Sequence, residues 1–265
     1  MSCVTRSDRK DIAILTVTRP PINALDHKAL EELNRAVRDL EGDAGVRVVV
    51  LASGVEGVFC TGGDLKFWRQ FPRDASRQVS RAGRNVFTRL ERLPCPTIAA
   101  IEGHVIGDGL ALALAADLRI ASETASFRVP EADYGFIPGW GVPYRLERTV
   151  GQAVALELLL TGLPVGAERA RQLGLVSQVV PAGQALPASR ELSEQISRKS
   201  PLALAWAKQV LREAPDAPDR DRWEEECFAQ VWGGTDWQEG IEALLAKRLP
   251  VFTNLAARRS QGRAK

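Results

Sequence analysis

In IEGHVIGDGLALALAADLRIAS, residues 101–122, a glycine-rich turn stands between a strand-like segment and a helix-like segment. LALALAAD (110–117) is apolar up to its last residue, which predicts a helix that is buried on all sides. PTIAAIEG (96–103) before it and LRIAS (118–122) after it have the length and composition of strands. A covered strand, a turn, a buried helix and a further strand in succession predict an α/β fold with a largely parallel sheet.

The same alternation continues toward the N-terminus. IAILTVTR (12–19) alternates branched apolar residues with threonine, and VRVVVLAS (46–53) is a nearly unbroken apolar run, so both predict strands. Between them, DHKALEELNRAVRDLEGD (26–43) has leucine and valine at helical spacing after a possible N-cap at Asp26. Right-handed crossovers are expected to connect these parallel strands.

Helical patterns dominate after about residue 151. GQAVALELLLTG (151–162), GAERARQLGL (166–175) and the segments from residue 185 onward all predict helices, and no further strand is expected. We therefore predict an α/β core over residues 1–190 and a helical C-terminal region over residues 191–265.

Composition limits the classes of function. The 265 residues, 45% hydrophobic and 26% charged, fit one large soluble domain or a domain with an appendage. A net charge of +2 gives no electrostatic argument for nucleic acid as a partner. Four scattered cysteines and two histidines predict no metal site. The charged N-terminus and the lack of an apolar run of about 18 residues predict a cytoplasmic protein with no membrane partner.

Two glycine turns are candidates for binding a negative charge. VFCTGGDLKFW (58–68) contains Gly62 and Gly63, with Asp64 placed to cap the following segment, and a second turn contains Gly107, Asp108 and Gly109. Each leads from a strand to a helix, and glycine lets backbone N–H groups approach a ligand. A single double glycine is more often only a turn. Two such turns could form an oxyanion hole, with donors about 3 Å from a developing negative oxygen.

A candidate general base lies in FRVPEADYGFIPGWG (127–141). Glu131 follows a proline at the end of a strand, among apolar neighbours, where burial would raise its pKa and make it a better base near neutral pH. An isolated glutamate is usually a solvated surface charge, and Asp133 is the rival carboxylate in the same segment.

These segments together carry a family resemblance. PPINALD, FCTGGDLK, residues 101–122, PEADYGFIPGWG, LTGLPVGAERARQLGLVSQVVP and EGIEALLAKRLPVF occur in this order between about residues 10 and 255. The chain thus resembles the crotonase superfamily, the enoyl-CoA hydratase/isomerase family. The resemblance implies a spiral of ββα turns that binds acyl-CoA thioesters and holds their enolate with the N–H groups of Gly63 and Asp108. It also implies trimers or hexamers formed through the C-terminal helices, and no cofactor besides the CoA of the substrate.

The chain departs from the family pattern at two positions. Asp108 stands where the family usually has a small residue, and we expect its side chain to turn away or to cap the helix that begins at Leu110. Ala111 stands where hydratases of the family have their first glutamate, while Glu131 occupies the place of the second. A single glutamate favours double-bond isomerisation. The alternatives are hydration with Asp108 or Asp133 as the second acid, lyase or decarboxylase chemistry, and a non-catalytic CoA or RNA binder.

The resemblance also implies substrate-binding residues. Ala24 and Leu25 of the NAL segment, with the loop residues Gly62, Asp64, Leu65 and Lys66, correspond to the wall around CoA. Lys66 and Lys247 are candidate partners for its phosphates. Trp68 and Gly109 complete the set near the acyl group. Trp140, where the family commonly has a small residue, is expected to shorten or flatten the acyl pocket, although simple packing is an equally good interpretation.

Overall fold

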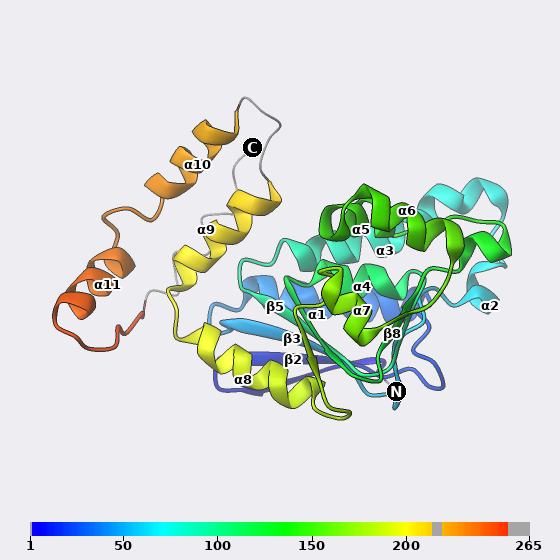
Figure 1. The fold of residues 1–265 in the computed structure, drawn as a ribbon, viewed down its shortest axis with the longest axis horizontal. Helices are drawn as coiled ribbons and strands as arrows, with labels where there is room; N and C mark the ends of the chain where they lie inside the picture. The colour runs from blue at the N-terminus through cyan, green and yellow to red at the C-terminus, as the bar shows by residue number, and fades with distance from the viewer. Residues whose placement is uncertain (1, 214–218, 254–265) are drawn as a thin grey trace.

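The computed structural model describes residues 2–213 and 219–253 (Figure 1). Its larger sheet has six strands in the order β1-β2-β3-β5-β7-β10. These are β1 (Val4–Arg9), β2 (Ile12–Val17), β3 (Val48–Ser53), β5 (Thr97–Ile101), β7 (Leu118–Ser122) and β10 (Gln178–Val180). Only β1 and β2 pair antiparallel in this sheet, and the other neighbours are parallel. The predicted α/β class with a largely parallel sheet is confirmed.

A smaller sheet runs beside it, in the order β4-β6-β8-β9. Its strands are β4 (Val58–Cys60), β6 (His104–Ile106), β8 (Ser126–Arg128) and β9 (Val165–Gly166). The first three are parallel, whereas β9 is antiparallel to β8. The chain places β3, β5 and β7 in the large sheet and the strand that follows each in the small one. A helix ends each turn: α3 (Ser76–Glu91), α4 (Gly109–Ala115) or α5 (Val142–Val150). This arrangement is the ββα spiral that the family resemblance implies.

The core lies on both faces of the large sheet. In β2, Ala13, Leu15 and Val17 face a large apolar cluster that includes α1 (His27–Gly42), α3 and α4. Ile12 and Ile14 face a smaller cluster under α8 (Ala185–Ser197). Every residue of α4 is buried, so the predicted all-round burial of this helix is confirmed. The turn before α4 is therefore anchored to a fully buried helix.

The expectation that strands end after about residue 151 is wrong. Both β9 and β10 lie beyond that point, and β10 extends the large sheet beside β7. They have two and three residues, too few for a periodic pattern to be visible in the sequence. The predicted boundary after residue 190 falls inside α8, whose buried face packs on the sheet.

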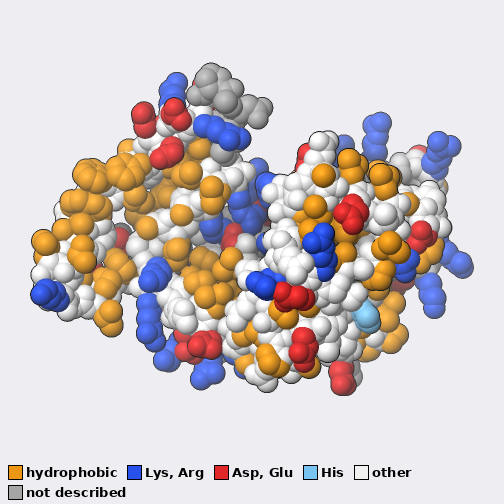
Figure 2. Space-filling model, in the orientation of Figure 1, with side chains coloured by type: hydrophobic (Ala, Val, Ile, Leu, Met, Phe, Trp, Pro, Cys, Tyr) orange, Lys and Arg blue, Asp and Glu red, His pale blue; other side chains and the backbone are white. Residues whose placement is uncertain are grey.

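The C-terminal helices leave the body of the molecule (Figure 1). After α6 (Gln152–Thr161), α7 (Ala167–Gln172) and α8, the helices α9 (Pro201–Arg212), α10 (Arg220–Ala229) and α11 (Thr235–Leu245) form an extended arm. Figure 2 shows hydrophobic side chains over this arm, where Phe228, Trp232 and Trp237 are exposed. Residues 254–265 of the predicted C-terminal region lie outside the described residues. None of the described helices is long and apolar enough to cross a membrane.

A partly buried group of charges joins α9 to α3 and α5. Glu91, at the end of α3, pairs with Arg145, Arg148 and Arg212, and the Arg145 guanidinium lies 2.8 Å from it. Arg212 and Lys208 on α9 also pair with Asp117, at 2.8 and 2.7 Å. Burial alone would raise the pKa of Glu91, but the three arginines outweigh it and lower that pKa.

Candidate active site

Two glycine turns meet at one edge of the small sheet. Gly62–Gly63 follows β4 and Gly107–Asp108 follows β6, its parallel neighbour, so both turns lie at the carboxyl ends of their strands. A Cβ atom at Gly62 would lie 2.8 Å from the backbone nitrogen of Asp108, and one at Gly109 would lie 2.1 Å from the carbonyl oxygen of Cys60. Only glycine permits this approach at both positions. The structure thus brings the two predicted N–H donors, of Gly63 and Asp108, into adjoining turns.

The NAL segment is bonded to the first of these turns. The Leu25 N–H donates to the Gly62 carbonyl at 2.7 Å, and the Asp64 N–H donates to the Leu25 carbonyl at 2.9 Å. Trp68 Nε1 donates to the same Leu25 carbonyl at 2.9 Å. Ala24 and Leu25 are both buried, and the backbone of Leu25 acts on the site through these hydrogen bonds, which hold the first turn and Trp68 in place.

Asp64 fixes the start of the short helix α2 (Leu65–Trp68). Its carboxylate accepts from the N–H groups of Lys66 and Phe67, at 3.0 and 3.2 Å, which confirms the predicted cap. Arg19 lies 2.8 Å from the same carboxylate. Burial raises the pKa of Asp64, but these donors outweigh it, so the net effect lowers that pKa. An ionised Asp64 therefore holds the loop, and the Lys66 side chain remains exposed.

Glu131 lies behind the second turn. It follows β8 in a 3-10 turn (Glu131–Tyr134) and is 4% exposed. A Cβ atom at Gly107 would lie 2.2 Å from Glu131 Oε1, so the carboxylate packs directly on this glycine, whereas Oε2 is buried with no hydrogen-bond partner among the described residues. The pKa of Glu131 is raised to about 7, chiefly by burial and also by the nearby Asp108 carboxylate, while backbone N–H groups, including that of Asp108, oppose the rise. The predicted burial and raised pKa of Glu131 are confirmed.

The expectation for the Asp108 side chain is wrong. It makes no capping bond to α4 and does not turn away from the site; instead Oδ1 accepts from the Gly139 N–H at 2.6 Å. That donor comes from the loop after Glu131, so tertiary contact overrides the local tendency of aspartate to cap a helix. Burial raises the pKa of Asp108 to about 6, although the Gly139 N–H lowers it in part. Asp133, in contrast, pairs with Arg128 at 2.8 Å and is exposed.

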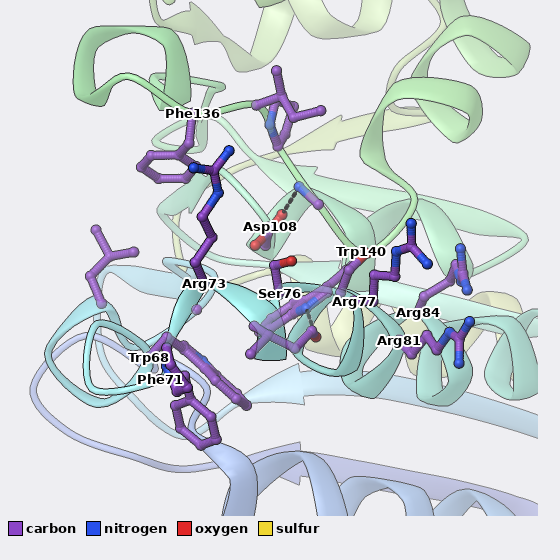
Figure 3. A pocket seen from close by; sticks show the side chains of 18 residues that line it. Trp68, Phe71, Arg73, Ser76, Arg77, Arg81, Arg84, Asp108, Phe136 and Trp140 are labelled. Atoms are coloured by element: carbon purple, nitrogen blue, oxygen red, sulfur yellow. Dashed lines mark hydrogen bonds between the residues drawn. The ribbon is translucent and has the colours of Figure 1, made fainter.

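A cavity of about 790 Å³ opens from these turns (Figure 3). It lies between α2, α3 and the loop at residues 136–140. Of the residues predicted from the sequence, Gly63, Leu65, Trp68, Asp108 and Trp140 line it. Lys66 is not part of this lining. Lys247 follows α11, and Figure 1 places that helix at the opposite end of the molecule from α2, so one chain does not bring the two lysines together.

Trp140 closes the inner side of this cavity. It is 3% exposed and adopts a left-handed backbone with φ 48°. Its indole Nε1 donates to the Val79 carbonyl at 3.1 Å, and its ring centroid lies 5.8 Å from that of Phe87. A Cβ atom at Gly83 of α3 would lie only 2.2 Å from the indole. Gly83, whose role no pattern in the sequence indicates, is therefore the position that admits this large side chain.

Comparison with known proteins agrees with this geometry. The family model described as enoyl-CoA hydratase/isomerase matches residues 7–255. The chain belongs to the enoyl-CoA hydratase/isomerase family. A probable mitochondrial enoyl-CoA hydratase 2 from Arabidopsis thaliana is 39% identical over 87% of this chain and 77% of its own length. A probable enoyl-CoA hydratase from Bacillus subtilis is 35% identical over 95% of this chain and 99% of its own length.

A solved structure shows the same fold. The enoyl-CoA hydratase from Bacillus anthracis superimposes with a TM-score of 0.90 at 31% identity, over 94% of this chain and 98% of that one. The protein is therefore an enzyme of the enoyl-CoA hydratase/isomerase family with the crotonase fold. In this family member, position 111 is a fully buried alanine of α4. Of the carboxylates beside the adjoining turns, Glu131 and Asp108 have raised pKa values, whereas Asp64 is paired with Arg19.

Proposed function

We propose that this enzyme hydrates a 2-enoyl-CoA thioester, with the N–H groups of Gly63 and Asp108 holding the enolate and with Glu131 and Asp108 exchanging protons. The observation that carries the proposal is the Asp108 carboxylate, which lines the cavity and has its pKa raised to about 6. Hydration needs one group that accepts a proton from water and another that delivers one to carbon. Asp108 supplies the second carboxylate, in place of the glutamate that is absent at position 111.

The surroundings of Asp108 and Glu131 set which of the two is protonated, and this gives the order of the proton transfers. Ionised Asp108 accepts a proton from water while the hydroxyl oxygen bonds to C3 and the C2–C3 π electrons move toward the thioester oxygen. Asp108 loses its negative charge as the enolate gains one, so their mutual repulsion falls during the step. Protonated Glu131, whose pKa is about 7, then delivers its proton to C2. A proton passes from Asp108 back to Glu131 through solvent to complete the cycle.

Asp108 and Glu131 lose their protons in the same range of pH. Burial raises both pKa values, to about 6 and about 7, and the Asp108 carboxylate adds to the rise at Glu131, so between about pH 6 and 7 we expect Asp108 to be ionised and Glu131 to be protonated. That singly protonated pair is the form the proposed hydration uses. A bell-shaped dependence of kcat/KM on pH is the corresponding expectation.

Double-bond isomerisation is the second candidate. It is favoured by Ala111, because of the two positions where hydratases of the family have glutamate, only position 131 has one here. In that reaction Glu131 removes a proton from C2 of a 3-enoyl thioester and returns it at C4, with the same two N–H groups holding the dienolate. Asp108 then takes no part in proton transfer.

The deciding experiment compares Asp108→Asn with the matched control Asp133→Asn. Both keep the backbone N–H, and both remove one charge, but only Asp108 lines the cavity. For hydration of crotonyl-CoA we expect Asp108→Asn to lower kcat by about 10²-fold or more, and Asp133→Asn to have little effect. Wild-type enzyme that converts trans-3-hexenoyl-CoA, fails to hydrate crotonyl-CoA and tolerates Asp108→Asn would select isomerisation instead.

We also propose that the enzyme assembles through the arm formed by α9–α11, as a trimer or a pair of trimers. The exposed Phe228, Trp232 and Trp237 support this because one chain leaves them in solvent. In such an assembly Lys247 would come from a neighbouring subunit to bind a CoA phosphate. No cofactor besides the substrate's CoA is needed for the proposed chemistry. Sedimentation of the wild type and of Trp232→Glu tests the assembly.

A further inference from the structure

Four arginines line the cavity that Asp108 faces. Arg77, Arg81 and Arg84 are spaced four and three residues apart on α3, so they share one helix face, and Arg73 precedes the helix. Figure 3 shows Arg77, Arg81 and Arg84 gathered on one side of Trp140. Asp108 is the one acidic residue among the described residues that line this cavity. The lining therefore has an excess of positive charge.

These four arginines have no ion pair with any carboxylate in the described part of the chain. Arg89, further along the same helix, does have one, with Glu41 at 2.6 Å. Like charges at four-residue spacing on a helix repel each other and destabilise it. All four arginines are also exposed, so they are not grouped here to fill or stabilise the interior of the protein. An anion bound in the cavity would supply the counter-charge that the described residues do not provide.

The anion has two possible sources with the same chemistry. It is a carboxylate on the acyl group or a phosphate of CoA, and guanidinium binds either through paired N–H groups. Lys66, the residue of this chain assigned to the CoA phosphates, lies outside the lining of this cavity. The arginines instead share the cavity with Trp68, Phe71 and Trp140, which offer apolar surface to an acyl chain. This separation favours the acyl group as the source.

We infer that the preferred acyl group ends in a carboxylate, which Arg77, Arg81 and Arg84 bind on the side of Trp140 where Figure 3 shows them. This inference rests on the proposed function, because it takes Gly63 and Asp108 as the groups that fix the thioester end. The expected substrates are therefore 2-enoyl-CoA thioesters of dicarboxylic acids.

Binding of saturated thioesters tests the inference without turnover. Adipyl-CoA and hexanoyl-CoA have six-carbon acyl groups that differ in the distal carboxylate, and free CoA reports on the phosphates alone. Their Kd values are measured by calorimetry for wild type, Arg81→Gln/Arg84→Gln and Arg35→Gln/Arg38→Gln. The last variant is the matched control, since it removes the same charge from two exposed arginines, also three residues apart on a helix, that lie outside the cavity. We expect wild type and control to bind adipyl-CoA about tenfold more tightly than hexanoyl-CoA, and the cavity variant to lose that preference.

Two results would overturn the inference. One is a wild type that binds both thioesters equally; the other is a cavity variant that weakens adipyl-CoA, hexanoyl-CoA and free CoA by the same factor, which would assign the arginines to phosphate. If the variant does not fold, Arg81→Lys/Arg84→Lys and a salt titration of the wild type replace it, since the preference must shrink as NaCl rises. Hydration of 2-hexenoyl-CoA is followed separately, so its absence refutes the proposed function without deciding the preference for a carboxylate.

Discussion

Glu91 and Glu131 are both buried glutamates, yet they have opposite surroundings. Glu91 pairs with Arg145, Arg148 and Arg212, and its pKa is lowered; Glu131 has no cationic partner among the described residues, and its pKa rises to about 7. Burial acts in the same direction on both, so the neighbours alone account for the difference. The compensated carboxylate joins helices, whereas the uncompensated one keeps a proton that it can exchange near neutral pH. The following experiments test this division.

The largest effect is expected from Glu131→Gln. Glutamine keeps the shape of the side chain but cannot transfer the proton, so kcat should fall by about 10²–10⁴-fold. Steady-state assays with an enoyl-CoA substrate measure this. A variant that retains most of the activity would show that Glu131 is only a buried structural residue.

Glu91→Gln should instead weaken the fold. It leaves Arg145, which is 1% exposed, without its carboxylate, and the loss of one partner of a buried ion pair costs about 3–5 kcal/mol. Urea denaturation at pH 7 gives the change in unfolding free energy. At a temperature where the variant is folded, its kcat should stay close to that of the wild type. A large loss of kcat in the folded variant would contradict the separation of the two roles.

The two glutamates should also differ in how they link stability to pH. The folded pKa of Glu131, about 7, exceeds the ordinary value of 4.5, so its contribution to stability is present below pH 4.5 and is lost as the pH rises through 7. The unfolding free energy of Glu131→Gln, measured relative to that of the wild type, should therefore increase by about 3 kcal/mol when the pH is raised from 4.5 to 8. Glu91, with a lowered pKa, contributes stability above its ordinary pKa and loses it as the pH falls. Denaturation curves at both pH values test the two opposite signs.

The smallest effect concerns the fit of Trp140 against Gly83. Alanine in a helix is normally better than glycine by about 1 kcal/mol, but at position 83 its Cβ would collide with the indole and cost about 1–3 kcal/mol. In a Trp140→Ala background the same substitution should be stabilising. Thermal unfolding of the four proteins in this cycle measures the reversal of sign. Additive effects would show that the indole moves aside freely.

Much of this architecture can be predicted because its cause is local. The apolar composition of residues 110–117 alone predicts the buried helix α4, and Pro130 with its apolar neighbours predicts a buried Glu131. The direction of the Asp108 side chain cannot be predicted in this way, because its partner, the Gly139 N–H, is 31 residues away. Likewise, the arginine spacing on α3 is visible in the sequence, but the cavity it faces is not. The strands β9 and β10 are too short to leave a pattern.

The contact between Gly83 and Trp140 also constrains how this pocket could change during evolution. A lineage that needed a larger cavity here would have to exchange the tryptophan for a small residue first. Only after that step could position 83 acquire a side chain without loss of stability. The reverse order passes through an intermediate with a steric clash inside a close-packed wall. The glycine in α3 therefore makes the substitutions that reshape this pocket depend on the order in which they occur.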